Sequence, residues 1–278
     1  MRITAEPLTG TRVLITGNSG ALARAVFCRL LHLDRPRELR PHPNISFISG
    51  LDIPDLATAR AILRDVDILI NTTSLCPAPL FRAIRDHDLP VVVAGVSSAR
   101  IPEPEPPLPQ AGARFVAVRL PPVLGSPASP VSWIQTQIRQ GGPVTIPSLG
   151  ATRFLLAPGQ AADTLLTAVQ VAEAGEIVVP VCPAARVQDI ATALIGGRDI
   201  PVTFAPPDTP LHDILITGEE AVRTVTRPGF GGAGYYVIRP QDRTDPPAIR
   251  GSYTSACPVL PPDAVRTLLQ KHLLGGCP

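Results

Sequence analysis

Tyrosine is missing from the first 234 residues of this 278-residue chain, and lysine occurs once, as Lys271. The three tyrosines are Tyr235, Tyr236 and Tyr253. A lysine charge beside a tyrosine lowers the pKa of the phenol, and that tyrosine can then move a proton on a hydroxyl or ketone group. The sequence has no Tyr-x-x-x-Lys motif, which excludes chemistry that depends on such a dyad in the middle of the chain.

Cysteine is also sparse. The five cysteines, at positions 28, 76, 182, 257 and 277, form no C-x-x-C pair, which argues against a zinc site and against a disulfide framework. No apolar run approaches the about 18 residues of a membrane span, and residues 1–11 lack the apolar core of a signal peptide. A net charge of +2 indicates neither nucleic acid nor a membrane surface as a partner. We therefore expect a cytoplasmic protein with no bound metal.

Proline is abundant, with 34 residues, and the densest cluster is "IPEPEPPLPQ" at 101–110. Proline lacks an amide proton and its ring clashes with the preceding helical turn, so this segment is predicted to be extended and not helical. The composition, 45% hydrophobic and 17% charged, is that of a folded protein. A chain of this length can bury a sizeable core, either as one large domain or as a domain with a lobe.

Apolar runs alternate with helical periodicity along the first 120 residues. The run "RVLIT" (12–16) fits a buried parallel strand, whereas Leu22, Val26 and Leu30 share one face of a helix. Strands that alternate with helices predict an α/β fold with a doubly wound, Rossmann-like parallel sheet. The expected strands are 12–16, 45–49, 67–71, 90–95, 115–119, 176–180 and 235–239, and the expected helices are 21–32, 56–66, 79–87, 130–140, 158–172, 187–195 and 261–272.

The pattern loosens after residue 121. We expect residues 1–121 to form a nucleotide-binding core and residues 122–278 to form a smaller carboxyl-terminal substrate lobe, with strands that return to the core sheet. Such a lobe would lie at the carboxyl edge of the sheet, where open α/β proteins bind their ligands. Little chain separates the end of the first helix at His32 from Arg40, so the sheet is expected to be shortened at its second strand.

A glycine turn joins the first strand to the first helix. Its spacing is G-x-x-G-x-x-A, from Gly17, Gly20 and Ala23. Glycines let the backbone turn tightly and approach a pyrophosphate, and the helix amino terminus offers unpaired N–H groups and a partial positive charge. The position of this turn predicts a nucleotide-phosphate site. The alternative interpretation is a tight strand–helix turn with no ligand.

Several segments resemble the extended short-chain dehydrogenases/reductases, and within them the branch of capsular-polysaccharide proteins and UDP-N-acetylglucosamine 4,6-dehydratases. The main ones are "LITGNSGALA" (14–23), "IRQGGPVTIPSLGATRFLL" (138–156) and "TPLHDILITGEEA" (209–221). The resemblance spans nearly the whole chain and implies NAD or NADP as a cofactor and a nucleotide or sugar nucleotide as the small-molecule partner. The cofactor-binding residues that it implies are Gly17, Asn18, Ser19, Gly20, Ala21, Asp52, Thr72 and Thr73.

The chain departs from this family where the catalytic residues lie. The sequence "SSAR" (97–100) stands where the branch has "STDK", so that Ala99 replaces the acidic residue and Arg100 replaces the lysine. Arginine keeps the charge but cannot release a proton at neutral pH. The proline cluster at 101–110 replaces the helix that carries the dyad in the family. That helix also belongs to the family's four-helix dimer interface, so an oligomer of this chain would need another surface.

The phosphate and ribose contacts of the family are altered as well. Asp34 or Arg35 could reach the ribose or a 2′-phosphate, and each could equally be an ordinary surface charge. NAD(P) binding is therefore expected to be weak or lost. Pro122 stands where the branch has the asparagine that holds the substrate diphosphate. Arg119 and Arg153 remain as candidates to bind a phosphate, with an internal ion pair as the alternative for each.

The candidate catalytic residues come from three places in the chain. The match around His212 favours a role in the substrate lobe. Cys76 follows the third strand, near the expected position of a nicotinamide, although a buried free cysteine is commonly a small hydrophobic residue. With the residues of the former catalytic loop, the candidates are Cys76, Ser97, Ser98, Arg100 and His212.

Two hypotheses about function follow. In the first, the chain is a diverged enzyme that acts on a nucleotide sugar or a related biosynthetic metabolite by a non-oxidative step, such as elimination or epimerisation. In the second, it is a catalytically silent ligand-binding protein, or a partner of an active relative, on the same scaffold. Better survival of the substrate-lobe motifs than of the cofactor motifs favours the first hypothesis.

Overall fold

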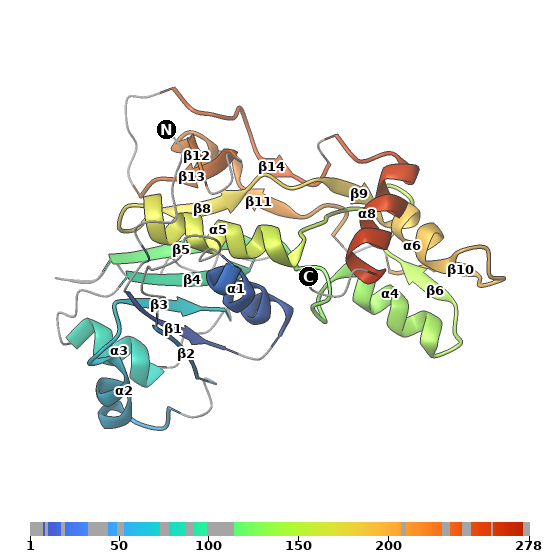
Figure 1. Cartoon of the computed structure of the whole chain (residues 1–278). Helices are drawn as coiled ribbons and strands as arrows, with labels where there is room; N and C mark the ends of the chain where they lie inside the picture. The colour runs from blue at the N-terminus through green and yellow to red at the C-terminus, as the bar shows by residue number, and fades with distance from the viewer. Residues whose placement is uncertain are drawn as a thin grey trace.

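The structure, a computed structural model, is an α/β protein built on one eight-stranded sheet (Figure 1). It describes residues 8, 11–17, 20–32, 44–48, 53–72, 78–86, 92–98, 114–206, 210–229, 234–240, 246–256 and 258–274. The strand order is β12-β13-β8-β5-β4-β3-β1-β2. Pairing is parallel from β2 to β8 and antiparallel for β13 and β12. The strands are β1 Arg12–Thr16, β2 Asn44–Ile48, β3 Ile68–Asn71, β4 Val92–Ser98, β5 Arg114–Leu120, β8 Ile177–Pro180, β12 Thr224–Pro228 and β13 Gly234–Ile238.

Helices cover both faces of the parallel part of the sheet. Helix α1 (Ala21–His32) packs beside α5 (Pro158–Val171) on one face, and α2 (Leu56–Leu63) packs beside α3 (Ala78–Asp86) on the other. Side chains alternate across a strand, so Val13 and Ile15 point toward α1 and α5, whereas Leu14 points toward α2 and α3. This alternation makes two apolar layers, one on each side of the sheet.

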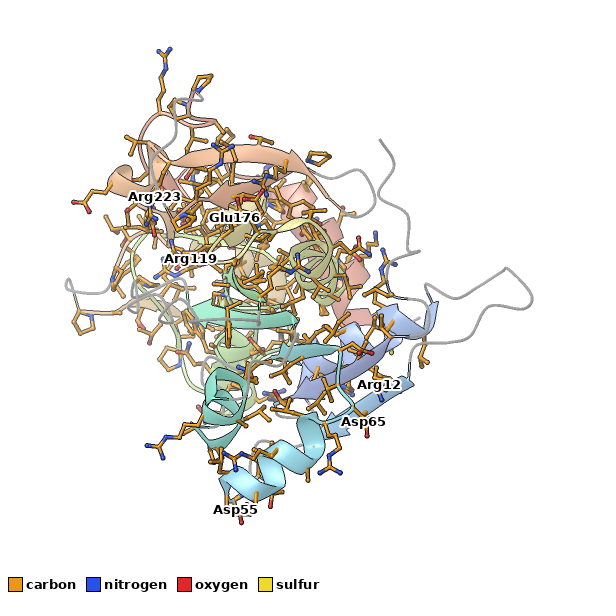
Figure 2. All side chains as sticks on the ribbon, turned by 90° about the vertical axis from the view of Figure 1, so that its left-hand side faces the viewer. Arg12, Asp55, Asp65, Arg119, Glu176 and Arg223 are labelled. Atoms are coloured by element: carbon orange, nitrogen blue, oxygen red, sulfur yellow. The ribbon has the colours of Figure 1, made fainter. Side chains whose placement is uncertain are left out.

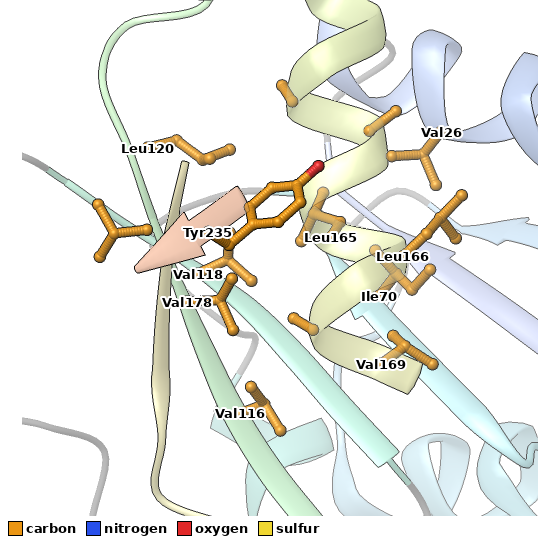
Figure 3. Close-up of a cluster of buried hydrophobic side chains, with 14 of the residues drawn as sticks. Val26, Ile70, Val116, Val118, Leu120, Leu165, Leu166, Val169, Val178 and Tyr235 are labelled. Atoms are coloured by element: carbon orange, nitrogen blue, oxygen red, sulfur yellow. The ribbon is translucent and has the colours of Figure 1, made fainter. Parts of the chain in front are cut away.

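Helix α5 is the most deeply buried covering helix of these four in the described residues. Figure 3 shows Leu165 of α5 on the same side as Val118 and Val178 of the sheet and Tyr235 of β13, and Leu166 on the other side of this helix. All five side chains are at most 2% exposed. A helix from the second half of the chain therefore covers strands from the first half.

The remaining elements gather mostly beyond one end of the sheet (Figure 1). Helices α4, α6 and α8 enclose a second apolar cluster, which includes Ile134, Ile190 and Val265. The elements are α4 Pro130–Arg139, β6 Val144–Ile146, β7 Thr152–Phe154, β9 Ala184–Arg186, α6 Val187–Ile195, β10 Val202–Phe204, β11 Ile214–Ile216, α7 Gly218–Ala221, β14 Tyr253–Thr254 and α8 Pro262–Leu274. Strand pairs β6/β10, β7/β9 and β11/β14 form three small two-stranded sheets.

The doubly wound α/β architecture predicted from the sequence is confirmed. Each expected helix and strand has a counterpart whose ends differ by three residues at most. Strand β2 lies at the edge of the sheet and pairs with all five residues of β1. The prediction of a shortened sheet concerns the chain between His32 and Arg40, and residues 33–43 lie outside the described residues, so it stays a prediction.

Candidate functional site

Four parallel strands end together at one edge of the sheet. Thr16 of β1 is opposite Asn71 of β3, which is opposite Gly95 of β4. Two residues further along β4, Ser97 is opposite Arg119 of β5. The loops that follow these strands therefore leave from a common edge, as the sequence predicted.

The turn after β1 needs a glycine. Gly17 has φ +134°, in the region that L side chains rarely adopt. Helix α1 begins four residues later at Ala21, and the Gly20 carbonyl accepts a hydrogen bond from the Arg24 N–H at 3.1 Å. Asn18 and Ser19 lie outside the described residues. The turn thus directs the amino terminus of α1 toward the carboxyl edge of the sheet, where it favours an anion.

The ends of β1 and β3 are tied together by side chains. Thr16 is fully buried and its hydroxyl donates to Asn71 Oδ1 at 3.1 Å. Both the N–H and the hydroxyl of Thr72 donate to the Thr16 carbonyl, at 2.9 and 3.0 Å. The hydroxyl proton of Thr72 is therefore committed, but its oxygen can still accept a hydrogen bond.

The loop after β5 approaches the amino terminus of α1. Gly125 has φ +86°, and a Cβ at this position would lie 3.8 Å from the Cβ of Ala21. The Leu124 N–H donates to the Leu156 carbonyl at 2.8 Å, which fixes the loop to the chain after β7. The loop that contains Pro122 and the α1 amino terminus therefore border the same part of the sheet edge.

Arg119 forms a buried ion pair. Its guanidinium donates to Glu220 through two hydrogen bonds, of 2.7 and 2.8 Å, and to the Leu215 carbonyl at 2.9 Å. The two side chains are 9% and 11% exposed. This is the alternative that the sequence left open for Arg119, and it joins the end of β5 to β11 and α7.

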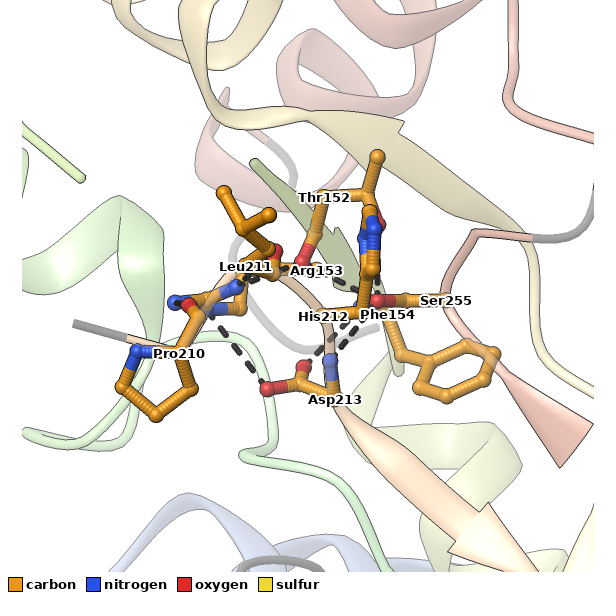
Figure 4. A network of polar contacts seen from close by, with 8 residues as sticks. All are labelled: Thr152, Arg153, Phe154, Pro210, Leu211, His212, Asp213 and Ser255. Atoms are coloured by element: carbon orange, nitrogen blue, oxygen red, sulfur yellow. Dashed lines mark hydrogen bonds and ion pairs between the residues drawn. The ribbon is translucent and has the colours of Figure 1, made fainter. Parts of the chain in front are cut away.

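Arg153 is also engaged inside the protein (Figure 4). Its Nε lies 3.5 Å from Asp213 Oδ1, and its two terminal nitrogens donate to the carbonyls of Thr152, Leu211 and Pro210 at 2.7–2.8 Å. Like Arg119, it holds segments of the chain together, and phosphate binding by either residue stays a prediction.

His212 belongs to the same network. Its Nδ1 lies 2.8 Å from the Thr152 hydroxyl, which lies 2.8 Å from the Ser255 hydroxyl (Figure 4). The adjacent Asp213 carboxylate accepts from the Phe154 N–H at 3.3 Å. The two matched segments, 138–156 and 209–221, thus meet through β7 and the chain before β11.

Other predicted site residues are only partly described. Ser97 and Ser98 form the last two positions of β4, opposite Arg119 and Leu120. Eight further predicted residues lie outside the described residues, namely Asn18, Ser19, Asp34, Arg35, Asp52, Thr73, Cys76 and Arg100. Their roles remain predictions.

Two of the three tyrosines have buried structural positions. Burial raises the pKa of Tyr235, an effect that hydrogen bonds with Thr167 and Thr164 oppose. The Tyr253 hydroxyl accepts from the Cys182 N–H at 3.0 Å and donates to its carbonyl at 3.2 Å. These positions explain why tyrosines recur near the carboxyl end of the chain without indicating a catalytic role.

Sequence reasoning missed one feature of this edge, the short helix α7. Thr217 Oγ1 accepts from the Glu220 N–H at 3.2 Å, and Glu220 Oε2 accepts from the Thr217 N–H at 2.9 Å. The T-x-x-E spacing of this capping box was visible in the sequence. The ion pair of Glu220 with Arg119, which is 101 residues away in the chain, was not visible in the sequence.

Neither a metal site nor a membrane-spanning helix is found in the described residues. No group of three or more His, Cys, Asp or Glu side chains there could hold a metal ion. No helix in that same part of the chain has the length and apolar character needed to cross a bilayer.

The sequence matches known proteins over its middle part. The family model described as polysaccharide biosynthesis protein matches residues 105–220. An uncharacterized membrane protein of Methanocaldococcus jannaschii is 35% identical over 94 residues, which are 34% of this chain and 28% of that protein. The capsular polysaccharide biosynthesis protein CapD of Staphylococcus aureus is 33% identical over 114 residues, which are 38% of this chain and 19% of that protein. The matched parts thus span less than a third of either relative.

Solved structures share the fold. Pen from Bacillus thuringiensis has a TM-score of 0.75 at 16% identity and covers 96% of this chain and 99% of its own. A dTDP-glucose 4,6-dehydratase from Bacillus anthracis, in complex with NAD, has a TM-score of 0.53 at 12% identity. The match covers 71% of this chain and 86% of the dehydratase chain. A UDP-N-acetylglucosamine 4-epimerase from Methanobrevibacter ruminantium, in complex with UDP-N-acetylmuramic acid, has a TM-score of 0.51 at 16% identity and covers 73% and 87%. The chain therefore has the fold of the short-chain dehydrogenases/reductases and, in its middle part, resembles their polysaccharide-biosynthesis branch.

Proposed function

We propose that this protein binds a nucleotide or sugar nucleotide at the carboxyl edge of its sheet and acts on it by a non-oxidative step, such as elimination or epimerisation. The observation that carries the proposal is the turn at Gly17, whose φ of +134° leads β1 into α1. The loop around Gly125 borders the same helix terminus. A helix terminus of this kind attracts an exposed anion by about 0.3–1 kcal/mol.

The residues around this turn fit the diphosphate of a dinucleotide. Gly17, Gly20 and Ala21 would present the turn and the helix terminus to it, and the Thr72 oxygen can accept a hydrogen bond. NAD(P), when bound, would accept and return a hydride. Related folds are known with NAD bound, but the Tyr-x-x-x-Lys motif is absent from this sequence. We therefore propose that cofactor binding is weakened and that the reaction needs no such dyad.

We propose candidate groups for the reaction from the end of β4, from the loops that follow the strands and from the carboxyl-terminal lobe. Ser97 and Ser98 close β4, and His212 lies where two matched motifs meet. We propose that these residues, with Arg100 and Cys76, replace the lost dyad. Resemblance to a capsular-polysaccharide protein supports a nucleotide sugar as the substrate class.

A second function is favoured by a specific observation. Arg119 and Arg153 are both committed to internal ion pairs, with Glu220 and Asp213. An enzyme of this type would need positive charge for a diphosphate, and these two arginines serve to hold the chain together. A catalytically silent ligand-binding protein, or a partner of an active relative, would retain the fold and these pairs without a catalytic group.

Calorimetric titration of NAD, NADP and UDP-N-acetylglucosamine into the protein tests the binding site. The variant Gly17→Val should abolish binding, because a β-branched side chain cannot adopt the backbone conformation of Gly17. Gly141→Val is the matched control, since Gly141 has φ +73° and open space around it at the end of α4. Equal loss of binding in both variants, or none in either, would place the site elsewhere.

Incubation with UDP-N-acetylglucosamine, followed by NMR, separates the two functions. A product that requires Ser97, Ser98 or His212 supports the enzyme. Binding without product supports the silent protein. Native mass analysis of the purified protein for a retained nucleotide gives an independent view of the ligand class.

A further inference from the structure

His212 is held by a chain of hydrogen bonds whose protons can be counted. The Ser255 hydroxyl accepts from the Asp213 N–H at 2.9 Å and donates to the Thr152 carbonyl at 3.0 Å. Ser255 has only one hydroxyl proton, and this carbonyl uses it. In the 2.8 Å contact between the two hydroxyls, Thr152 must therefore be the donor.

The direction of the next contact follows. The single proton of the Thr152 hydroxyl points at Ser255, so its oxygen is the acceptor in the 2.8 Å contact with His212 Nδ1. Nδ1 must then carry a proton, and in the neutral ring Nε2 must be bare, because the hydrogen bond of one ring nitrogen sets the state of the other. If Ser255 instead donated its proton to the Thr152 hydroxyl, the Ser255 hydroxyl oxygen and the Thr152 carbonyl oxygen would face each other at 3.0 Å with no proton between them.

The backbone around His212 is fixed as well. The Leu211 carbonyl accepts from the Thr152 N–H at 2.9 Å and from Arg153 at 2.8 Å. The Asp213 carbonyl accepts from the Ser255 N–H at 3.0 Å. The segment is thus held on both sides of His212, and the imidazole has little freedom to change its direction.

The other ring nitrogen is open. His212 is half-buried, and Nε2 has no hydrogen-bond partner in the described part of the chain. Its neighbours Leu211 and Ile214 are 49% and 47% exposed. A bare, fixed nitrogen at a partly exposed position is an acceptor ready for an O–H donor.

We propose that Thr152 and Ser255 are positioning residues that lock His212 in the Nδ1–H tautomer, so that Nε2 accepts a hydrogen bond from a hydroxyl group of the bound ligand. The ligand part rests on the proposed function and assigns the sugar ring attached to the diphosphate of a sugar nucleotide, and not the nucleotide's ribose, to this place in the lobe. The tautomer part rests on the hydrogen bonds of the chain alone.

Long-range ¹H–¹⁵N correlation NMR of the full-length protein, at a pH where the ring is neutral, tests the tautomer. The His212 signals are assigned by their loss in His212→Asn. The wild type should show a protonated Nδ1 and a bare Nε2. A dominant Nε2–H form would overturn the proposal.

Two variants test the positioning residues. Ser255→Ala should turn the Thr152 proton toward Nδ1 and convert the ring to the Nε2–H form, and Thr152→Val should lower the Nδ1–H fraction. Thr152→Ser keeps the hydroxyl and should keep the wild-type tautomer. Thr145→Val is the control, because Thr145 on β6 pairs its hydroxyl with Thr203 on β10, in another two-stranded sheet. If Ser255→Ala and Thr152→Val both fold and leave the tautomer unchanged, these residues do not position the ring.

Addition of UDP-N-acetylglucosamine or UDP tests the ligand part. The sugar nucleotide should move the Nε2 signal, UDP should not, and His212→Phe should weaken sugar-nucleotide binding by about 3- to 10-fold, the value of one neutral hydrogen bond. Binding that leaves Nε2 unmoved would refute recognition by His212 while the proposed nucleotide site stands. If neither compound binds, the proposed function and the ligand role both fail, and the tautomer spectra alone decide the positioning claim.

Discussion

Buried charge is costly unless it is paired, and the pair of Arg119 and Glu220 shows this at the scale of single residues. Their side chains are 9% and 11% exposed and meet through two hydrogen bonds. By contrast, the side chains of Arg12 and Asp65 are 44% and 73% exposed, although their nitrogen–oxygen distance is also 2.7 Å (Figure 2). The distance alone therefore does not decide what each pair contributes.

Arg119→Met should lower the free energy of unfolding by about 3–5 kcal/mol, because it leaves the Glu220 carboxylate buried without its partner. Arg12→Met, the matched control, should change it by about 1 kcal/mol or less. Urea denaturation monitored by circular dichroism measures both. The double variant Arg119→Met, Glu220→Leu should recover much of the loss, and a similar small effect for both single variants would contradict the argument.

Glu220 also gives a pH dependence. Burial by itself raises the pKa of its carboxyl, but hydrogen bonds from Arg119 and Thr217 outweigh burial and hold the pKa below the ordinary 4.5. The folded state therefore binds this proton less readily than the unfolded state. The stabilisation is fully present above pH 4.5 and is lost as the pH falls through the lowered pKa.

Urea midpoints at about pH 7 and about pH 3 should accordingly differ less in Glu220→Gln than in the wild type. The difference in urea midpoint between the two pH values that remains in Glu220→Gln is due to the other titratable groups. An equal acid-induced loss in both proteins would show that Glu220 does not contribute.

The sequence could predict those properties of single residues that depend on the adjacent residues in the chain. Gly17 was predicted from its place between a strand and a helix, and it has the positive φ that the turn requires. The partner of Arg119 lies 101 residues away, and no local spacing reveals such a contact. For that reason the sequence left two interpretations open for Arg119 and Arg153.

At the scale of elements, local signals were sufficient for most boundaries. The first amphipathic helix was predicted at 21–32 and is found at Ala21–His32. Helix α7 was missed because four residues, Gly218–Ala221, are too few to show a helical period. Its capping box, at Thr217 and Glu220, was the one available signal.

Capping can be tested on a longer helix, α4. Ser129 is fully buried, and its hydroxyl accepts from the Val131 N–H at 3.3 Å at the start of this helix. Ser129→Ala should lower the free energy of unfolding by about 0.5–2 kcal/mol. Ser132→Ala, within the same helix, should be neutral or slightly stabilising, because alanine has the higher helix propensity. Equal urea midpoints for the two variants would show that the cap does not matter.

At the scale of the molecule, strand order could not be predicted from local patterns. Strand β8 comes from residues 177–180 but lies directly beside β5, and β13 follows it in antiparallel pairing. Packing between distant parts of the chain determines which strands pair with one another. Helix α5 takes part in this packing, since six of its eight buried residues belong to the apolar cluster that includes strands of the first half.

We therefore expect the boundary proposed at residue 121 to mark a change in sequence character and not the limit of an independently folding unit. The fragment 1–121 would leave the faces of β1, β3 and β5 that pack under α5 exposed to water, and apolar surface of that kind causes aggregation or unfolding. We expect this fragment to show neither dispersed NMR signals nor a cooperative urea transition, whereas the full chain shows both. Mixing it with the fragment 122–278 should restore part of the native signal, because the missing helix and strands are then supplied. A fragment 1–121 that unfolds cooperatively on its own would mean that its strands form a stable core without α5.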